Sequence, residues 1–200
     1  LALGETATIT LEPGEFAFYP LDLAPGQSVI VTDTGDLNRS AAVYDADGRS
    51  LWHGGSAWSR PTAIIRAVGS GDAPYFYEIQ NRGDVTGEFI INMTETETHT
   101  LALGERYELT AEQDFPFEVI FDGQAGQTVL VDSSSNLFHY DVDYIADDGT
   151  YEWIQSQHSL FPPVNGFDLP ADGTYRVNVY PPRQGEPVPD GAYIVVRKAA

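Results

Sequence analysis

The stretch LALGE occupies residues 1–5 and returns unchanged at residues 101–105. Self-similarity at a fixed period is the signature of a repeated structural unit. Further segments recur in the same order at an offset close to 100 residues: APGQSVIV (24–31) with QAGQTVLV (124–131), YDADG (44–48) with YIADDG (144–149), DAPYFY (72–77) with DGTYRV (172–177), and GEFII (87–91) with GAYIV (191–195). The sequence therefore predicts two copies of one domain, at residues 1–95 and 101–200.

Residues 96–100 form the boundary between the copies. The surrounding stretch TETETHT, residues 94–100, alternates threonine with other polar residues. Threonine favours extended backbone. We therefore expect a short connector with a strand-like backbone.

Each copy has the pattern of about eight short strands separated by turns rich in Gly, Pro and Asp. Copy one contains the runs 6–11, 15–19, 27–32, 42–44, 50–52, 62–67, 75–80 and 88–93. Several runs alternate apolar and polar residues, which is typical of half-buried strands. The side chains expected to face inward are Phe16, Phe18, Val29, Val31, Tyr75, Tyr77 and Ile79. The pattern predicts an all-β protein with two tandem jelly-roll-like antiparallel β-sandwich domains.

The chain is strongly acidic, with a net charge of −20, and Lys198 is its only lysine. A nucleic acid or an anionic membrane surface needs a basic face, so neither is an expected partner. Acidic surfaces are typical of secreted or halotolerant proteins, and solubility through charge repulsion explains them equally well.

The sequence contains no cysteine, which excludes disulfides and cysteine-based metal sites. No apolar run approaches the roughly 20 residues that a membrane-spanning helix needs, so membrane insertion is not expected. The chain starts at Leu1 without a methionine. We interpret it as a mature or trimmed secreted or cell-surface protein.

These motifs resemble the bacterial pre-peptidase C-terminal domain family and, more loosely, jelly-roll carbohydrate-binding modules. The resemblance is carried by the opening LxLG, the aromatic strands at 16–19 and 117–121, the GQxVxV strands at 26–31 and 126–131, the YDxDG hairpin at 44–48, ADGTYRVNV at 171–179 and GAYIVV at 191–196. The resemblance implies a non-catalytic appendage of the kind found on secreted hydrolases and surface proteins. The resemblance implies a β-sandwich fold and no active site, and here it is not accompanied by a catalytic domain.

Aspartates around the central hairpin are candidate calcium ligands: Asp45, Asp47, Asp141, Asp143, Asp147 and Asp148, with Asp33, Asp36 and Asp132 as weaker candidates. Calcium takes about six to eight oxygen ligands, and aspartates two residues apart in a turn supply several of them. The same sequence is typical of an Asp-Gly hairpin turn, in which Asp caps its own backbone. Both interpretations stay open at the level of sequence.

Tryptophans are the candidate sugar contacts, because aromatic rings stack on apolar sugar faces. Trp58 lies in the loop-like stretch GGSAWS, residues 54–59, and has no counterpart in copy two. It is the candidate ligand contact. Trp52 and Trp153 follow equivalent turns in the two copies, and we interpret both as core residues.

No HExxH or GxSxG motif occurs, and the sequence predicts no enzyme. The first functional hypothesis is an extracellular structural protein that assembles with itself into a filament or layer. Its exposed edge strands, or the terminal segments Leu1–Thr10 and Tyr193–Arg197, would add to a neighbour's sheet. The alternative is a carbohydrate- or substrate-binding accessory module of a secreted hydrolase system, with polysaccharide as the partner.

Overall fold

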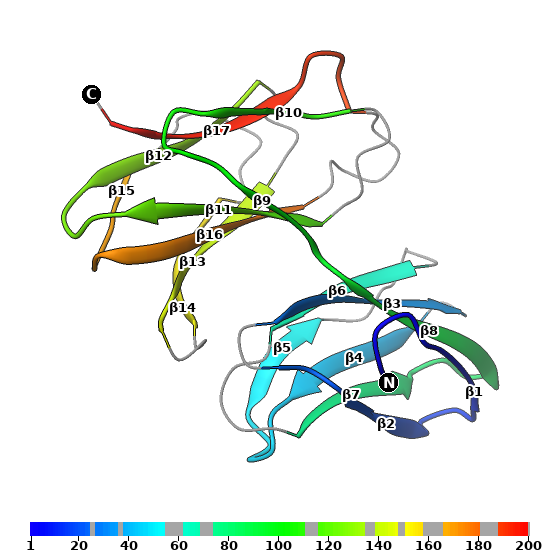
Figure 1. Cartoon of the computed structure of the whole chain (residues 1–200). Helices are drawn as coiled ribbons and strands as arrows, with labels where there is room; N and C mark the ends of the chain where they lie inside the picture. Colours follow the sequence, from blue (N-terminus) through cyan, green and yellow to red (C-terminus); the bar gives the residue numbers. More distant parts are fainter. Residues whose placement is uncertain are drawn as a thin grey trace. The chain divides into compact units, whose positions relative to one another are not determined.

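The computed structural model describes residues 1–24, 27–35, 38–54, 62–68, 74–110, 116–134, 139–147, 151–157, 166–180 and 188–199, with only the backbone described at 51–54, 62–68, 139 and 156–157. The chain divides into two compact units, which we call unit 1 (Leu1–Thr96) and unit 2 (Glu97–Asp147 with Tyr151–Ala200). Strands joined by turns and short loops build both units, and the described residues contain no helix (Figure 1). The predicted all-β class is confirmed.

Unit 1 consists of two four-stranded sheets. One has the order β1-β8-β3-β6 and the other the order β2-β7-β4-β5, and every neighbouring pair is antiparallel. The strands are β1 (Thr6–Leu11), β2 (Phe16–Leu21), β3 (Ser28–Gly35), β4 (Arg39–Tyr44), β5 (Ser50–Gly54), β6 (Thr62–Val68), β7 (Tyr75–Asn81) and β8 (Gly87–Glu95). Both sheets contribute side chains to one hydrophobic core, so they pack face to face.

Strand periodicity predicts most of this core. Val29, Val31 and the three β7 residues Tyr75, Tyr77 and Ile79 are fully buried, as expected. The prediction for Phe16 and Phe18 is wrong, because these two side chains are 58% and 51% exposed. On β2 the neighbouring positions Ala17, Tyr19 and Leu21 face the core instead. A strand that alternates two apolar sets does not reveal which set is inside.

Unit 2 repeats the strand order of unit 1 and adds one strand. Its sheets have the orders β10-β17-β12-β15 and β14-β13-β16-β11-β9. The strands are β9 (Glu97–Thr100), β10 (Arg106–Glu108), β11 (Phe117–Gly123), β12 (Thr128–Ser133), β13 (His139–Ile145), β14 (Tyr151–Gln157), β15 (Phe167–Asp168), β16 (Gly173–Tyr180) and β17 (Tyr193–Lys198). When β10 to β17 are matched in order to β1 to β8, the two units have identical neighbours within each sheet.

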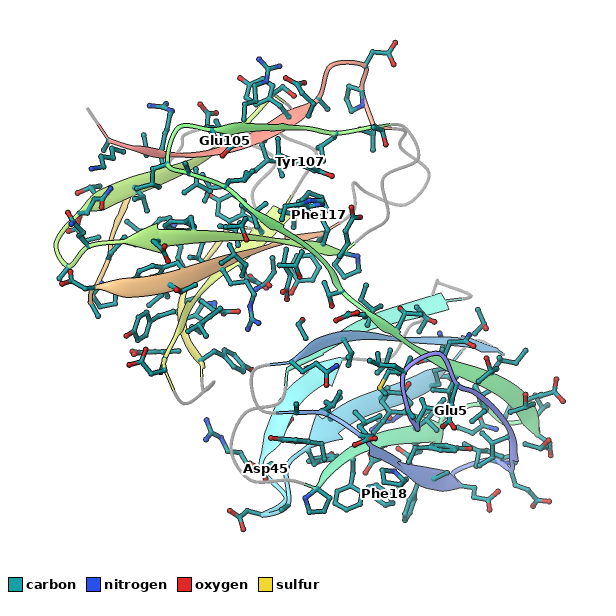
Figure 2. The ribbon with its side chains drawn as sticks, viewed as in Figure 1. Glu5, Phe18, Asp45, Glu105, Tyr107 and Phe117 are labelled. Atoms are coloured by element: carbon teal, nitrogen blue, oxygen red, sulfur yellow. The ribbon has the colours of Figure 1, made fainter. Side chains whose placement is uncertain are left out.

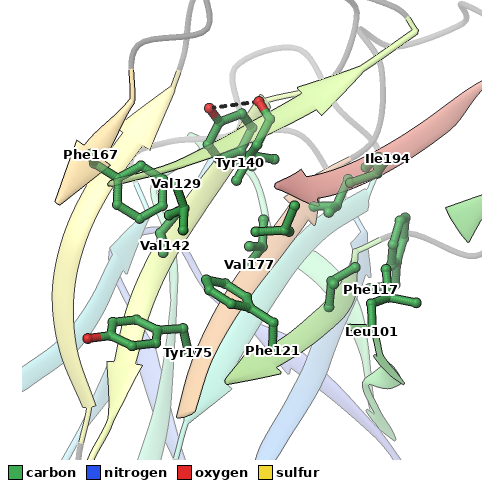
Figure 3. Close-up of a cluster of buried hydrophobic side chains, with 14 of the residues drawn as sticks. Leu101, Phe117, Phe121, Val129, Tyr140, Val142, Phe167, Tyr175, Val177 and Ile194 are labelled. Atoms are coloured by element: carbon green, nitrogen blue, oxygen red, sulfur yellow. Dashed lines mark hydrogen bonds between the residues drawn. The ribbon is translucent and has the colours of Figure 1, made fainter. Parts of the chain in front are cut away.

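The core of unit 2 also lies between its two sheets (Figure 3). Phe121 stacks on Tyr175 with 5.4 Å between ring centroids. Tyr140 lies at one end of the cluster and donates a 3.5 Å hydrogen bond to the Val131 carbonyl. Burial raises the pKa of Tyr140 to about 12, and the charge of Asp132 adds to the shift.

The connector belongs to unit 2. Residues Glu97–Thr100 form β9, which pairs parallel with β11 and places Thr98 opposite Glu118 and His99 opposite Val119. Thr96, immediately before it, is buried in unit 1, where its N–H donates to the Ser28 carbonyl at 3.3 Å. The backbone is extended, as its threonines predict.

One local turn accounts for the repeated LALGE motif. The Glu5 N–H donates to the Ala2 carbonyl at 3.0 Å, and Gly4 has a φ of +79°, as a type II turn requires at its third residue. The Glu5 carboxylate accepts the Ala2 N–H at 2.9 Å. The same pair of bonds closes the turns at 12–15, 24–27, 102–105 and 124–127, with Gln as the acceptor in two of them.

Candidate functional surfaces

Asp45 closes the hairpin between β4 and β5. Its Oδ1 accepts the N–H groups of Asp47 at 3.1 Å and Arg49 at 2.8 Å. Gly48 has a φ of +76°, and its N–H donates to the Asp45 carbonyl. These are the bonds of an aspartate-capped turn followed by a left-handed glycine. The Asp45 carboxylate is therefore a structural part of the hairpin, and Asp47 beside it is exposed.

The aspartates of copy two are dispersed. Asp143 is buried on β13, Asp141 is half-buried on the same strand, and Asp147 is exposed in the following turn. Asp148 lies outside the described residues. Across the parts of the chain that the structure describes, no three acidic or histidine side chains come together as metal ligands. Calcium binding stays a prediction of the sequence.

The weaker candidates have other partners. Asp33 is fully buried in unit 1, where Arg39 pairs with it through Nε–H and donates from a second guanidinium nitrogen to its carbonyl at 3.0 Å. The Tyr77 hydroxyl donates to Asp33 Oδ2 at 2.6 Å. Asp132 pairs with Arg197 at 3.3 Å. Asp36 lies outside the described residues.

The buried network around Asp33 shifts the acidity of two of its members. Burial raises the pKa of Asp33, while the hydrogen bond from Tyr77 and the charge of Arg39 oppose the rise. Burial and the neighbouring Asp33 carboxylate raise the pKa of Tyr77 well above its ordinary value. Asp33 lies on β3 and its two partners lie on β4 and β7, so the network joins the two sheets of unit 1 through the core.

A second polar network lies on the five-stranded sheet of unit 2, on the face turned away from the hydrophobic core. Arg176 contacts Asp143 at 3.5 Å and Glu118 at 3.6 Å, and Asn178 donates to Asp143 Oδ2 at 2.9 Å. The Arg176 guanidinium also lies 5.7 Å from the centre of the Tyr151 ring. All four polar residues are buried. Each buried carboxylate is therefore matched with a cation or an amide donor.

Trp153 lies beside this network and is 59% exposed, so the prediction that it is a core residue is wrong. The pairing of β13 with β14 shifts register between Val142 and Asp143, and Trp153 is the partner of Asp143. Cross-strand partners share a face of a sheet, and Asp143 points away from the core. In unit 1 the shift lies between Val43 and Tyr44, and the backbone of Trp52 pairs with that of Val43. The Trp52 side chain, also predicted to lie in the core, is outside the described residues. The two tryptophans occupy different register positions relative to the shift in their strand pairs.

Phe16 and Phe18 form an exposed aromatic pair on β2. Their rings meet edge to face with centroids 5.5 Å apart. Figure 2 shows Phe18 on the side of the sheet turned away from the core. Sequence reasoning placed both rings inside, and only a comparison with copy two, which has Pro116 and Glu118 at these positions, could have indicated a surface role. Trp58 lies outside the described residues.

The two terminal segments differ in their availability. β1 is an edge strand, but β17 lies between β10 and β12 and is hydrogen-bonded on both sides. The prediction that residues 193–197 can add to a neighbouring subunit's sheet is therefore wrong, because their backbone groups are used within unit 2.

Comparison with known proteins adds no identification: no protein-family model matches the chain, and no curated protein matches it. Within its described part, the chain has no helix long and apolar enough to cross a bilayer.

Proposed function

We propose that the chain is a non-catalytic extracellular structural protein, built from two tandem jelly rolls, that assembles with copies of itself into a filament or layer. The strand order supports the jelly-roll assignment. In unit 1 the orders 1-8-3-6 and 2-7-4-5 are those of an eight-stranded double Greek key, and unit 2 has the same orders with β9 added. The motifs similar to pre-peptidase C-terminal domains support an extracellular role.

The way the repeats are joined carries this proposal. Thr96 is the last residue bonded within unit 1, and Glu97 begins a strand of unit 2, so no residue serves only as a linker. A module that ends where the next begins suits a serial building block. The buried carboxylates Asp33 and Asp143 are paired with arginines, which is a structural use of charge.

The contact that would propagate an assembly is the open edge of β1. Glu5 and Gly4 exchange hydrogen bonds with Met93, so the alternate residues Thr6, Thr8 and Thr10 turn their N–H groups away from β8. An edge with unpaired N–H and C=O groups is a template for a strand from another chain.

Sedimentation velocity and negative-stain microscopy over a range of protein and calcium concentrations test the assembly. We expect concentration-dependent oligomers. Thr8→Pro should abolish them, because it removes an outward N–H without breaking a bond to β8. Thr8→Val, which keeps the N–H, is the matched control and should still assemble. A strictly monomeric protein at every concentration would exclude this function.

The second candidate is a polysaccharide-binding accessory module, which the exposed aromatic rings favour. Phe16, Phe18 and Trp153 are exposed and offer flat apolar faces on which sugar rings can stack. A glycan array on Phe16→Ala/Phe18→Ala, Trp153→Ala and Trp58→Ala variants tests it. Val85→Ala is the control, because Val85 is an exposed apolar residue outside these groups. Binding that survives all the aromatic substitutions would count against this candidate.

A further inference from the structure

The equivalent edges of the two units differ in one respect. In unit 2 the outer edge of β11 is covered by β9, which pairs with it over four residues. In unit 1 the equivalent strand β2 ends its sheet, and no strand of the described chain lies on its outer edge.

The backbone contacts between Leu1 and β2 match those between Leu101, the residue after β9, and β11. In unit 2 the Leu101 N–H donates to the Ile120 carbonyl at 2.9 Å, directly after the parallel ladder. In unit 1 the amino group of Leu1 donates to the Pro20 carbonyl, and the Asp22 N–H donates to the Leu1 carbonyl at 3.2 Å. Leu1 therefore already occupies the position on β2 that Leu101 occupies on β11.

The backbone groups on the open edge of β2 follow from this contact. N–H and C=O groups of one residue point to the same side of a strand, and alternate residues share that side. Because the Pro20 carbonyl faces the open edge, the backbone groups of Phe16 and Phe18 face it too. Pro20 supplies no N–H, so Phe16 and Phe18 are the available donors.

The side chains beneath the edge show what kind of strand fits. In unit 2, His99 of β9 packs against Tyr107 at 4.1 Å and Phe117 at 5.8 Å between ring centroids. Figure 2 labels the two rings Tyr107 and Phe117. The corresponding residues of unit 1 are Ala7 and Ala17, at the same offset of 100 residues. Both alanines are only half-buried. Two aromatic rings are thus replaced by two methyl groups, so a side chain larger than histidine would be needed to fill the same volume.

We infer that the open edge of β2 is a strand-acceptor site. Its occupant is an extended segment joined to the amino group of Leu1 and running parallel to β2, with a bulky apolar residue two positions before Leu1. That residue packs over Ala7 and Ala17, where the position equivalent to His99 lies. The residue three positions before Leu1 lies beside Phe18, as Thr98 lies beside Glu118.

This inference rests on the repeat architecture of the proposed function and not on self-assembly. A monomeric protein in the sedimentation experiment would reject assembly and leave the acceptor site untouched. Loss of the acceptor site would likewise leave assembly through β1 untouched.

The test extends the full chain before Leu1 by Glu-Thr-X-Thr, which copies residues 97–100 with a variable third residue. Amide hydrogen exchange at Phe18 is the readout, and Phe16, whose counterpart Pro116 precedes the β9–β11 ladder, is the internal control. With X as Phe, we expect exchange of the Phe18 amide to slow at least tenfold relative to the unextended chain, while exchange of the Phe16 amide stays unchanged. Protection should fall in the order Phe, His, Gly, and vanish with Pro, which disrupts the strand.

A second variant tests the fit beneath the strand. Ala17→Phe restores the ring found at Phe117, so it should reduce the protection given by X as Phe and leave that given by X as His intact. If Ala17→Phe fails to fold, the original chain extended with X as Gly still reports on backbone pairing alone. Equal protection by Phe and Gly, or none at Phe18 in any extended chain, would overturn the inference. If a free peptide of the same sequence, added in excess, slowed exchange and the covalent extension did not, the claim that the occupant is joined to Leu1 would be overturned.

Discussion

Asp33, Arg39 and Tyr77 place an ion pair and a hydroxyl inside the core of unit 1. In copy two the corresponding positions of β12 and β16 are Ser133 and Val177, so the same sheet packing forms without the charged group. Burying an ion pair removes two charges from water, and its net contribution to stability is small or negative. The network is therefore dispensable as a whole but sensitive to partial removal.

Arg39→Leu should destabilise unit 1 by about 3–5 kcal/mol, because it leaves the Asp33 carboxylate buried without its cation. Tyr77→Phe removes one hydrogen bond and should cost about 1–2 kcal/mol. The triple variant Asp33→Ser/Arg39→Leu/Tyr77→Val, which introduces the copy-two residues at two positions, should recover most of the Arg39→Leu loss. Urea denaturation measures all three, and a triple variant as unstable as Arg39→Leu alone would contradict this account.

Tyr140 makes a pH-dependent contribution to stability. In the folded protein the Tyr140 hydroxyl has a pKa of about 12, whereas a tyrosine in the unfolded chain has a pKa of about 10. The contribution is complete below about pH 10 and is lost as the pH rises toward 12. The free energy of unfolding should fall in this window by about 1.4 kcal/mol per pH unit for such a tyrosine.

Tyr140→Phe should make this alkaline decline shallower and leave stability at pH 7 nearly unchanged, since its hydrogen bond to Val131 is long, at 3.5 Å. Urea denaturation of both proteins at several pH values between 8 and 12 measures the slope. Identical slopes would show that Tyr140 titrates alike in the folded and unfolded chains.

At the scale of elements, one four-residue turn is used repeatedly at strand connections. In the turns at 2–5, 12–15, 102–105 and 124–127 the third residue is a left-handed glycine. The fourth residue of each turn is Glu or Gln, whose side-chain oxygen accepts the first residue's N–H. The turns share a side-chain oxygen that accepts a backbone N–H, and they do not share a negative charge, because Gln127 makes the same bond as Glu105.

Glu105→Ala should therefore destabilise unit 2 by about 1 kcal/mol, while Glu105→Gln should be close to neutral. Gly104→Ala should cost about 1–2 kcal/mol, because its φ of +91° is unfavourable for a residue with a Cβ atom. Thermal unfolding of the three variants measures these differences. A Glu105→Gln loss equal to that of Glu105→Ala would show that charge, rather than hydrogen bonding, matters at this turn.

Strand pairing is where sequence reasoning failed at the scale of elements. The repeat aligned Trp52 with Trp153, but a register shift within the β13–β14 pair places Trp153 on the outward face. A one-residue change of register moves a side chain from the core to the surface. The prediction that Phe16 and Phe18 face inward is wrong for a related reason. The alternate residues of the same strand, Ala17, Tyr19 and Leu21, offer an equally continuous apolar face.

At the scale of the whole molecule, the net charge of −20 opposes compactness through self-repulsion. Salt screens such repulsion over about 10 Å at 0.1 M and less at higher concentration. Raising NaCl from 0.05 to about 1 M should therefore stabilise the protein by about 1 kcal/mol, which corresponds to an increase in Tm of about 4–8 °C for a domain of this size.

Replacing the exposed residues Asp84 and Glu88 by lysine provides the control. Each substitution adds two positive units, so the net charge changes from −20 to −16. This variant should be more stable at low salt and less responsive to added salt. A salt response equal to that of the original protein would locate the effect in specific ion binding instead of general repulsion.

The sequence by itself determined the duplication, the all-β class, the main turns and most of the core, because repeats, strand periodicity and positive-φ glycines are local properties of the chain. Only the tertiary structure decided whether a strand covers the sheet edge beside each repeated LALGE segment. Their flanking backbone contacts match, yet β9 covers β11 over Tyr107 and Phe117, whereas no strand among the described residues covers β2 over Ala7 and Ala17. Which edge is covered depends on pairing between strands distant in sequence and on the space beneath them, and neither is a local property.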